Sequence, residues 1–316
     1  MLEAKVWYAA VNQCFFSLST TIGALIMFGS YNNFNHNSYR DAWIVSGMDT
    51  LTSLFAGFTV FAVLGNLAGE LDVEVEDVAR AGAGLTFVSF AQGLGTFEVV
   101  PQLFSVLFYL MLLTLGVGSA VSLTQSIIAM ICDQFPKLVR WQVTTGVCLS
   151  GFLIGLIYVT PGGFFMQDLV EHFGANFTIF FMAMLEGVAI GWVYGVNNWI
   201  TDLEFMVNVR LGWYWKICWA GFVPVGLGVI LVYTLATETR WTMNKLEYPD
   251  SAIALGWLLS SFGMALIPLL GAFAIKKSEG NTFMEKFRNS LKPNIKWGPK
   301  KPSIRKKWLE FKAQRS

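Results

Sequence analysis

Long apolar runs dominate the hydrophobic pattern of the chain, and they predict membrane-spanning helices. Four windows contain no charged residue: residues 99–132, 141–167, 217–237 and 251–275. Two further windows, residues 42–69 and 173–201, contain one acid each, Asp49 and Glu186 respectively. A helix needs roughly 20 apolar residues to cross the ~30 Å core of a bilayer, and each window is long enough. With an apolar first segment at residues 12–31, the pattern predicts seven spans.

The first apolar segment has a run of hydroxyl side chains in its middle: Ser17, Ser19, Thr20 and Thr21, followed by Gly23. A helix in lipid normally satisfies its own backbone groups, because no water is available at that depth. Hydroxyl side chains compete for backbone partners and favour an interruption. Broken helices near the bilayer midplane form ion and solute sites in transporters. The run therefore predicts a broken helix and a transporter-like site.

Composition supports an all-α integral membrane protein. Hydrophobic residues make up 54% of the chain and charged residues only 14%, with a mean hydropathy of +0.53; soluble domains carry about 25% charged residues. The sequence has no phosphate-binding loop, dinucleotide-binding turn or nucleophile elbow. Two histidines and four cysteines support neither a metal centre nor a disulfide framework. We therefore expect no enzyme activity, no bound cofactor and no nucleic-acid partner.

Basic residues predict the orientation and a two-part organisation. Residues 276–316 hold 13 of the 22 Lys and Arg residues and only three acids, which predicts a cytoplasmic tail near anionic lipid. Residues 1–275 form the predicted transmembrane part. The acidic connection at residues 70–98 is then outside, where residues 73–95 fit one or two short helices, as a lid or as a plain connector. Counting back through seven spans places residue 1 outside without a signal peptide, so we expect further sequence upstream.

Seven spans with an external start also fit a G-protein-coupled receptor. The third span, however, ends in Cys132-Asp133-Gln134-Phe135-Pro136, without the acidic-Arg-aromatic triplet of such receptors. The last span contains Pro268 without the Asn-Pro-x-x-Tyr pattern. These differences argue against a receptor.

Short blocks follow one another in a family-specific order: Gln13-Cys14-Phe15-Phe16-Ser17-Leu18, Ser30-Tyr31-Asn32-Asn33-Phe34-Asn35-His36-Asn37, Tyr39-Arg40-Asp41-Ala42, Leu113-Thr114-Leu115-Gly116, Asp133-Gln134-Phe135-Pro136, Leu185-Glu186 with Trp192-Val193-Tyr194-Gly195, and Trp213-Tyr214-Trp215-Lys216-Ile217-Cys218-Trp219. The chain thereby resembles the neurotransmitter:sodium symporter family (solute carrier family 6), especially its insect nutrient amino acid branch. The resemblance implies helices 6 to 12 of a twelve-helix transporter, which are the second inverted repeat and two C-terminal helices of the broken-helix fold. Helices 1 to 5 are expected to be missing.

Residue spacing places the candidate side chains on shared helix faces, because residues four apart are neighbours on a helix. Three sets have this spacing: Gln13 with Ser17, Asp49 with Ser53, and Leu115 with Ser119 and Leu123. In the family that the chain resembles, these faces converge on the ion and substrate sites.

The resemblance also implies a role for each residue. Substrate contacts are implied for Phe16, Ser19, Thr20, Ile22, Ser119 and Leu123. The first sodium site would use Ser17 and Asp49, and the second Leu115, Gly118 and Ser119. Chloride would bind at Gln13, Ser17 and Ser53. Glu186 would be the acid of the outer gate and Asp133 that of the inner gate, supported by Tyr31. Each of these residues has an ordinary structural alternative. The hydroxyls would bond to carbonyl oxygens of their own helix, the aromatic rings would pack in the core or at the membrane interface, and the acids would be paired or solvated.

Two positions depart from the family pattern. Asp49 stands where most members have asparagine, and a carboxylate within a span is costly unless it is paired or functional. If it is ionised, Asp49 should strengthen cation binding and weaken chloride binding; a protonated or helix-paired Asp49 with a structural role is the alternative. Gly118 stands where relatives have an oxygen-bearing side chain, so the second sodium site should be weaker.

The predicted function is secondary active transport at the plasma membrane by a multi-pass protein. A cation gradient, mainly sodium with potassium left open, would drive uptake of neutral amino acids; the need for chloride and homo-oligomer formation are left open. The chain alone is expected to be inactive, because it holds half of each site. A non-transporting short form or partner subunit is the alternative, and a symporter of amine or GABA-type neurotransmitters is a more remote one.

Overall fold

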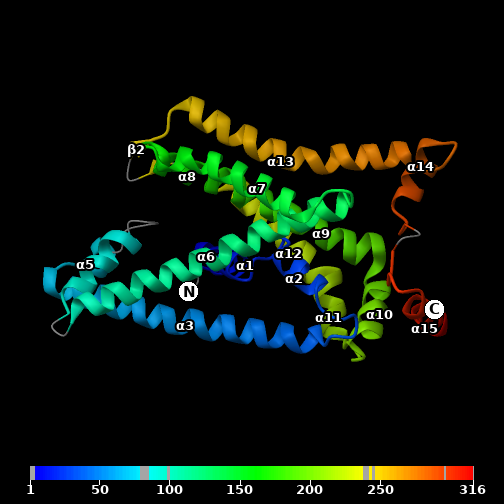
Figure 1. Ribbon diagram of the computed structural model, residues 1–316, viewed down its shortest axis with the longest axis horizontal. Helices are drawn as coiled ribbons and strands as arrows, with labels where there is room; N and C mark the ends of the chain where they lie inside the picture. Colours follow the sequence, from blue (N-terminus) through cyan, green and yellow to red (C-terminus); the bar gives the residue numbers. More distant parts are fainter. Residues whose placement is uncertain are drawn as a thin grey trace. The chain divides into compact units, whose positions relative to one another are not determined.

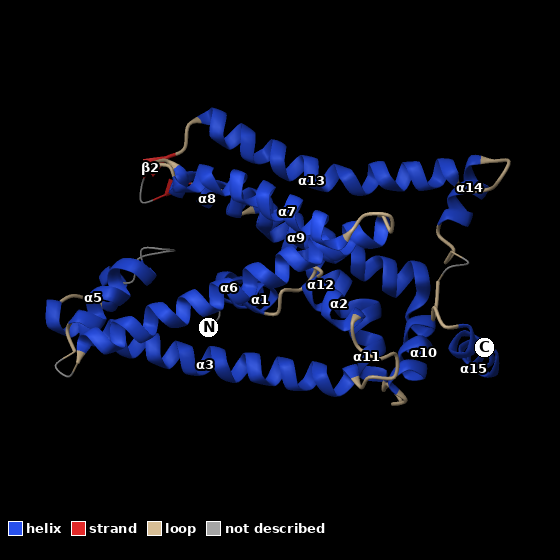
Figure 2. Ribbon diagram, in the orientation of Figure 1, coloured by secondary structure: helices blue, strands red, loops and turns tan. Residues whose placement is uncertain are grey.

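The computed structural model describes residues 4–78, 85–97, 100–237, 242–243, 246–294 and 297–315. Its regular structure is almost entirely helical (Figure 2). Two short strands, β1 (Thr242–Met243) and β2 (Leu246–Glu247), pair antiparallel in the connection before α13. The chain forms two compact units, one of residues 1–39 and 141–316 and the other of residues 40–140. Parts of the predicted 70–98 connection, residues 79–84 and 98–99, lie outside the described residues.

The unit of residues 40–140 contains two long helices and the short elements that connect them. These elements are α3 (Ser38–Leu71), α4 (Val75–Val78), η1 (Leu85–Ser89), α5 (Phe90–Gly95) and α6 (Pro101–Gln134). The short helix α5 packs against both long ones: the rings of Phe90 and Phe108 stack at 4.4 Å, and Gly93 lies against Val63. The short helices predicted for residues 73–95 are therefore present as α4 and α5.

The unit of residues 1–39 and 141–316 contains the remaining elements (Figure 1). In chain order they are α1 (Ala4–Ser17), α2 (Ala24–Ser30), α7 (Arg140–Gly155), η2 (Leu156–Val159), α8 (Gly163–Val170), η3 (Glu171–Asn176), α9 (Phe177–Val188), η4 (Ala189–Gly195), α10 (Val196–Val207), α11 (Trp213–Ile217), η5 (Cys218–Phe222), α12 (Val223–Ala236), α13 (Asp250–Lys277), α14 (Phe283–Ser290) and α15 (Pro302–Arg315).

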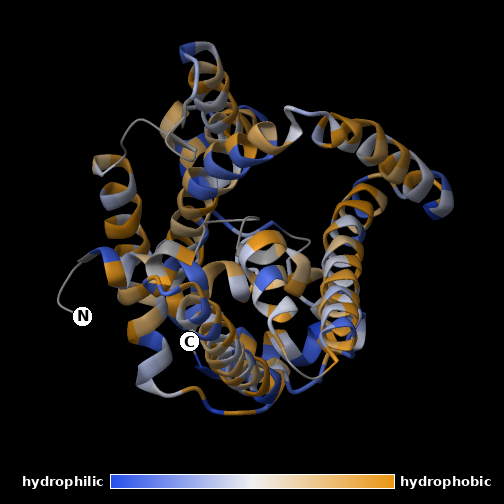
Figure 3. Cartoon of the chain, turned by 90° about the vertical axis from the view of Figure 1, so that its left-hand side faces the viewer, coloured by the Kyte–Doolittle hydropathy of each residue, from blue (hydrophilic) through white to orange (hydrophobic). Residues whose placement is uncertain are grey.

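Six helical stretches among the described residues are long and apolar enough to cross a membrane: Ser38–Leu71, Pro101–Gln134, Arg140–Val159, Gly163–Val207, Trp213–Ala236 and Asp250–Lys277. Hydrophobic residues predominate along many helices of the chain (Figure 3). The predicted first span, residues 12–31, is absent from this set because it is split into α1 and α2, and neither half is long enough alone.

One predicted span ends earlier than expected. The charge-free window at residues 141–167 contains one candidate span, Arg140–Val159, which ends because the chain turns at Thr160 before α8 begins at Gly163. Pro161 and Gly162 lie in this turn, and both residue types favour a break in a helix. Since neither carries a charge, counting charged residues alone did not reveal the turn.

Close packing of α9 against α12 holds the centre of the larger unit. Phe180 and Ala183 form a buried cluster with Leu227 and Leu231. Gly187 also faces Pro224 of α12, where an added Cβ atom would lie 3.5 Å away, at ordinary van der Waals distance. Burial of large apolar side chains contributes about 1.5–3 kcal/mol each, which makes this cluster a rigid base for neighbouring residues.

Candidate functional site

The first apolar segment is a broken helix, as its hydroxyl run predicts. The helix α1 ends at Ser17 and α2 begins at Ala24. Between them, Ser19 and Thr21 have left-handed backbone angles, with φ of 49° and 68°. Gly23 has a φ of 88°, a conformation that favours glycine. Three left-handed residues within five positions prevent a continuous helix.

Hydrogen bonds from Thr20 end α1, and some carbonyl oxygens in the connection that follows accept no backbone hydrogen bond from a described residue. The Thr20 hydroxyl donates to the Phe15 carbonyl oxygen at 3.0 Å, and the Thr20 N–H donates to the same oxygen at 3.3 Å. No described backbone N–H donates to the carbonyl oxygens of Ser19 or Thr21. Oxygen atoms are the ligands that hard cations prefer. The connection between α1 and α2 therefore offers oxygen ligands inside an apolar region.

A cavity of about 470 Å³ borders this connection. Its lining comes from the end of α1, the connection, α2, α9, η4, α10, η5 and α12: Phe15, Ser19, Thr20, Thr21, Gly23, Leu25, Ile26, Ala183, Glu186, Gly187, Ile190, Trp199, Trp219, Val223 and Leu227. The volume lies within the ~300–1,000 Å³ typical of small-molecule sites. Most of these side chains are apolar, so the cavity suits a ligand with an apolar part and one charged end.

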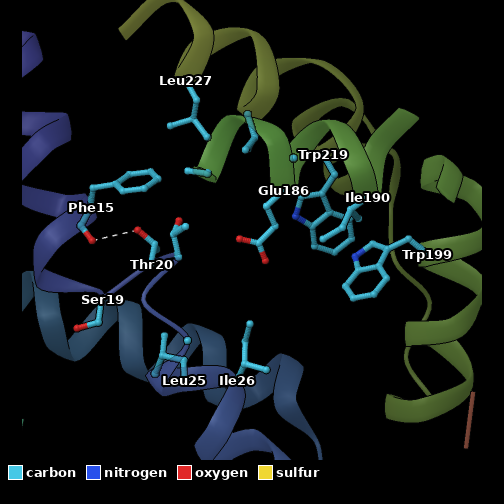
Figure 4. A pocket seen from close by; sticks show the side chains of 15 residues that line it. Phe15, Ser19, Thr20, Leu25, Ile26, Glu186, Ile190, Trp199, Trp219 and Leu227 are labelled. Atoms are coloured by element: carbon cyan, nitrogen blue, oxygen red, sulfur yellow. Dashed lines mark hydrogen bonds between the residues drawn. The ribbon is translucent and has the colours of Figure 1, made fainter. Parts of the chain in front are cut away.

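Glu186 is the only acid that lines this cavity among the described residues. Its side chain extends from α9 toward Thr20 on the opposite wall (Figure 4). No described residue forms an ion pair with its carboxylate. A carboxylate in a spanning segment is costly unless a cation or a donor compensates it. The arrangement places one negative charge opposite the open backbone of the connection.

Two tryptophans that the sequence-based prediction did not include complete one wall. Trp199 lies in the first turn of α10 and Trp219 lies in η5, with their ring centroids 6.5 Å apart. Trp192 holds η4 against η5 because its Nε1 donates to the Ala220 carbonyl oxygen at 2.6 Å. The four-residue spacing of Trp215 and Trp219 predicts a shared helix face, but Trp215 does not line the cavity, so this spacing does not identify Trp219 as a lining residue.

The predicted residues of the first segment divide into two groups. Ser19 and Thr20 line the cavity. Phe16 and Ile22 are not among the lining residues; the neighbouring Phe15 lines the cavity and packs on Phe180 with ring centroids 5.4 Å apart. Gln13 and Ser17 lie on α1 outside the lining, and Tyr31 caps α2 with an exposed side chain.

The other predicted residues belong to the second unit. Asp49 and Ser53 lie on α3, and the remaining ones lie on α6: Leu115, Gly118, Ser119, Leu123 and Asp133. Asp133 is exposed at the C-terminal end of α6, next to its last residue Gln134. The convergence of these residues on the cavity stays a prediction, as do their roles in binding ions and in gating.

Comparison with known proteins gives a consistent result. Residues 1–278 match the sodium:neurotransmitter symporter family. The chain is 46% identical over 319 residues to the "Sodium-dependent nutrient amino acid transporter 1" of Drosophila melanogaster, a match that covers 100% of the chain and 50% of the relative. The protein of the same name from Drosophila ananassae is 44% identical over 317 residues, with the same coverage.

The chain spans about half the length of the curated relatives it matches. The match covers most of the chain, including the broken helix, the cavity and the six apolar helical stretches. Together with the order of the sequence blocks, it shows that the chain belongs to the sodium:neurotransmitter symporter family, as a multi-pass membrane protein of the plasma membrane.

Proposed function

We propose that this chain provides one half of a sodium-coupled symporter for neutral amino acids. The observation that carries the proposal is the break between α1 and α2, which faces Glu186 across an otherwise mainly apolar cavity. A zwitterionic amino acid with an apolar side chain matches this lining. Its ammonium group suits backbone oxygens and a nearby carboxylate, while its side chain suits Leu25, Ile26 and Val223.

The proposed ion sites combine the first segment with α3 and α6. Ser17 and Asp49 would hold one sodium ion, and the Leu115 carbonyl with Ser119 would hold a second. Gly118 provides no side-chain oxygen at the second site, so weaker binding is expected there. Hydroxyl, carbonyl and carboxylate oxygens suit a hard cation such as sodium, and potassium in the same sites is a matter for direct measurement.

The anion site and the gates are proposed from the same family pattern. Gln13, Ser17 and Ser53 would hold chloride. Glu186 and Asp133 would act as the outer and inner gate acids. The position of Glu186 in the cavity also suits direct attraction of a cation or a substrate ammonium group, because its carboxylate faces the connection between α1 and α2 across the cavity.

The names of the relatives favour nutrient amino acids over amine or GABA-type substrates for the whole protein.

A chimera tests the proposal. This chain replaces the matching half of the Drosophila melanogaster relative, and uptake of radiolabelled neutral amino acids is measured with sodium or with choline outside. We expect uptake that depends on sodium and exceeds that of mock-transfected cells, while residues 1–316 expressed alone remain at background. A chimera at the cell surface that takes up no amino acid would contradict the proposal. Uptake by residues 1–316 alone would contradict the claim that the site is only half present.

A further inference from the structure

A second cavity, of about 670 Å³, lies where the C-terminal helix α15 packs beside α10 (Figure 1). Its walls come from α10, the end of α2 and the loop that follows it, the segment that leads into α15, and α15 itself. The transport proposal makes no use of this cavity. All of its walls belong to the larger unit, so its geometry is defined within that unit.

Charged contacts hold α15 on α10. The Asp202 carboxylate accepts hydrogen bonds from Lys312 Nζ at 2.9 Å and from Trp308 Nε1 at 2.7 Å. Arg315 forms an ion pair with Glu204, whose side chain is buried. The acids at this end of α10 are therefore already compensated by α15 and do not repel an anion in the cavity.

Apart from Asp202, the polar side chains that line the cavity can all donate hydrogen bonds. Lys300 and Lys301 both line it, and no described residue forms an ion pair with either. The carboxamides of Asn32 and Asn33 also line the cavity and form no hydrogen bond with another described residue. Asp202 is the only acid in the described lining, and it is paired with Lys312. The cavity thus carries an uncompensated positive charge.

We propose that this cavity binds a phosphorylated ligand, either the headgroup of an anionic lipid or a free polyol phosphate. Phosphate oxygens are strong acceptors that match ammonium and carboxamide donors. The volume exceeds the needs of a simple ion and fits a ring-bearing headgroup, for which Trp297 and Pro299 offer flat apolar faces. A ligand in this position would join the segment before α15 to the loop that follows α2.

The chain contains a matched control for general attraction between a basic helix and phosphate. Lys306 and Lys307 are also adjacent and exposed on α15, but they do not line the cavity. Replacing either pair with glutamine removes the same charge, from the segment just before α15 in one case and from α15 itself in the other. Only the cavity pair should matter if the ligand enters the cavity.

The experiment measures binding to the purified protein in phosphatidylcholine nanodiscs. One probe is phosphatidylinositol bisphosphate incorporated in the nanodisc, and the other is soluble inositol trisphosphate. We expect K300Q/K301Q to weaken binding roughly 30-fold, and K306Q/K307Q to weaken it by less than about threefold. The variant K300R/K301R, which keeps both charges, should retain binding, and an unchanged melting temperature of K300Q/K301Q shows that the fold is intact.

The two probes separate the sources of the ligand. Binding of the lipid with little binding of the soluble phosphate identifies a headgroup site, and comparable binding of both identifies a site for free phosphates. Equal weakening by the two lysine pairs would overturn the proposal, because it indicates diffuse attraction. Failure of both probes to bind would overturn it as well. None of these outcomes depends on whether the protein transports amino acids.

Discussion

The hydroxyl of Thr20 donates a hydrogen bond to the carbonyl oxygen of Phe15 at 3.0 Å, and this contact closes α1 where the chain turns left-handed. Replacing Thr20 with valine preserves the shape of the side chain but removes the donor. A lost hydrogen bond of this kind costs about 1 kcal/mol. We expect T20V to lower the melting temperature of the detergent-purified protein and T20S to preserve it; equal melting temperatures for T20V and the unmodified protein would contradict this role.

Gly23 provides the second test of the break. Its φ of 88° disfavours any residue with a Cβ atom, although an added Cβ would meet no atom within 4 Å. The cost of G23A is therefore conformational, about 1–2 kcal/mol. Gly29 also has open space around it but lies within α2 and has no positive φ, so alanine there favours the helix. We expect G23A to destabilise the protein and G29A to leave it unchanged or more stable, as measured by thermal unfolding.

Removing the charge of Glu186 tests the electrostatics of the cavity. We expect E186Q to reduce sodium-dependent uptake by the chimera by roughly tenfold or more, because the cavity loses its only described negative charge. The exposed Glu279, which follows α13, provides the control, and E279Q should transport normally. Normal uptake by E186Q at normal surface expression would show that the carboxylate has only a structural role.

The sequence predicted the break better than it predicted the cavity around it. Hydroxyl residues and Gly23 signal a local backbone interruption, which depends on nearby residues alone. The choice of Phe15 over Phe16 as a lining residue depends on how α1 rotates against Phe180, a tertiary contact without a local signal. Trp199 joins the wall for a similar reason, since α10 follows a sharp change of direction at Gly195, where φ is 92°.

The contact between α15 and α10 should be stable across neutral pH. Burial lowers the pKa of Lys312, but hydrogen bonds to Tyr194 and Asp202 outweigh burial, so the pKa is raised above 10.5. A raised lysine pKa means that the stabilisation is complete below the ordinary pKa and is lost as pH rises through the raised value. We expect the distribution of distances between spin labels on α10 and α15 to stay narrow from about pH 6 to 9. It should broaden only in stronger alkali.

Removing the carboxylate of Asp202 should release α15 at any pH in that range. D202N leaves Lys312 without its counter-charge, so we expect a broad distribution of spin-label distances. Glu310 lies exposed on α15 and forms no ion pair with a described residue, so E310Q should keep the narrow distribution. A narrow distribution for D202N would show that the other contacts, including the ion pair of Arg315 with Glu204, are sufficient to hold α15.

Asp49 leads to a prediction about chloride. An ionised carboxylate near the proposed chloride site would repel the anion, so uptake by the chimera should persist in chloride-free medium. D49N should increase the dependence on chloride, because it removes the competing negative charge. An absolute chloride requirement of the chimera with Asp49 intact would contradict this account.

The central claim is that the connection between α1 and α2 forms part of the substrate site. The most direct measurement is the labelling rate of S19C by a thiol reagent in the chimera, after all native cysteines are replaced by serine. We expect sodium with a transported neutral amino acid to slow labelling of S19C but not of S303C, which lies on the exposed start of α15. Labelling of S19C at the same rate with and without substrate, in a chimera that transports, would contradict it.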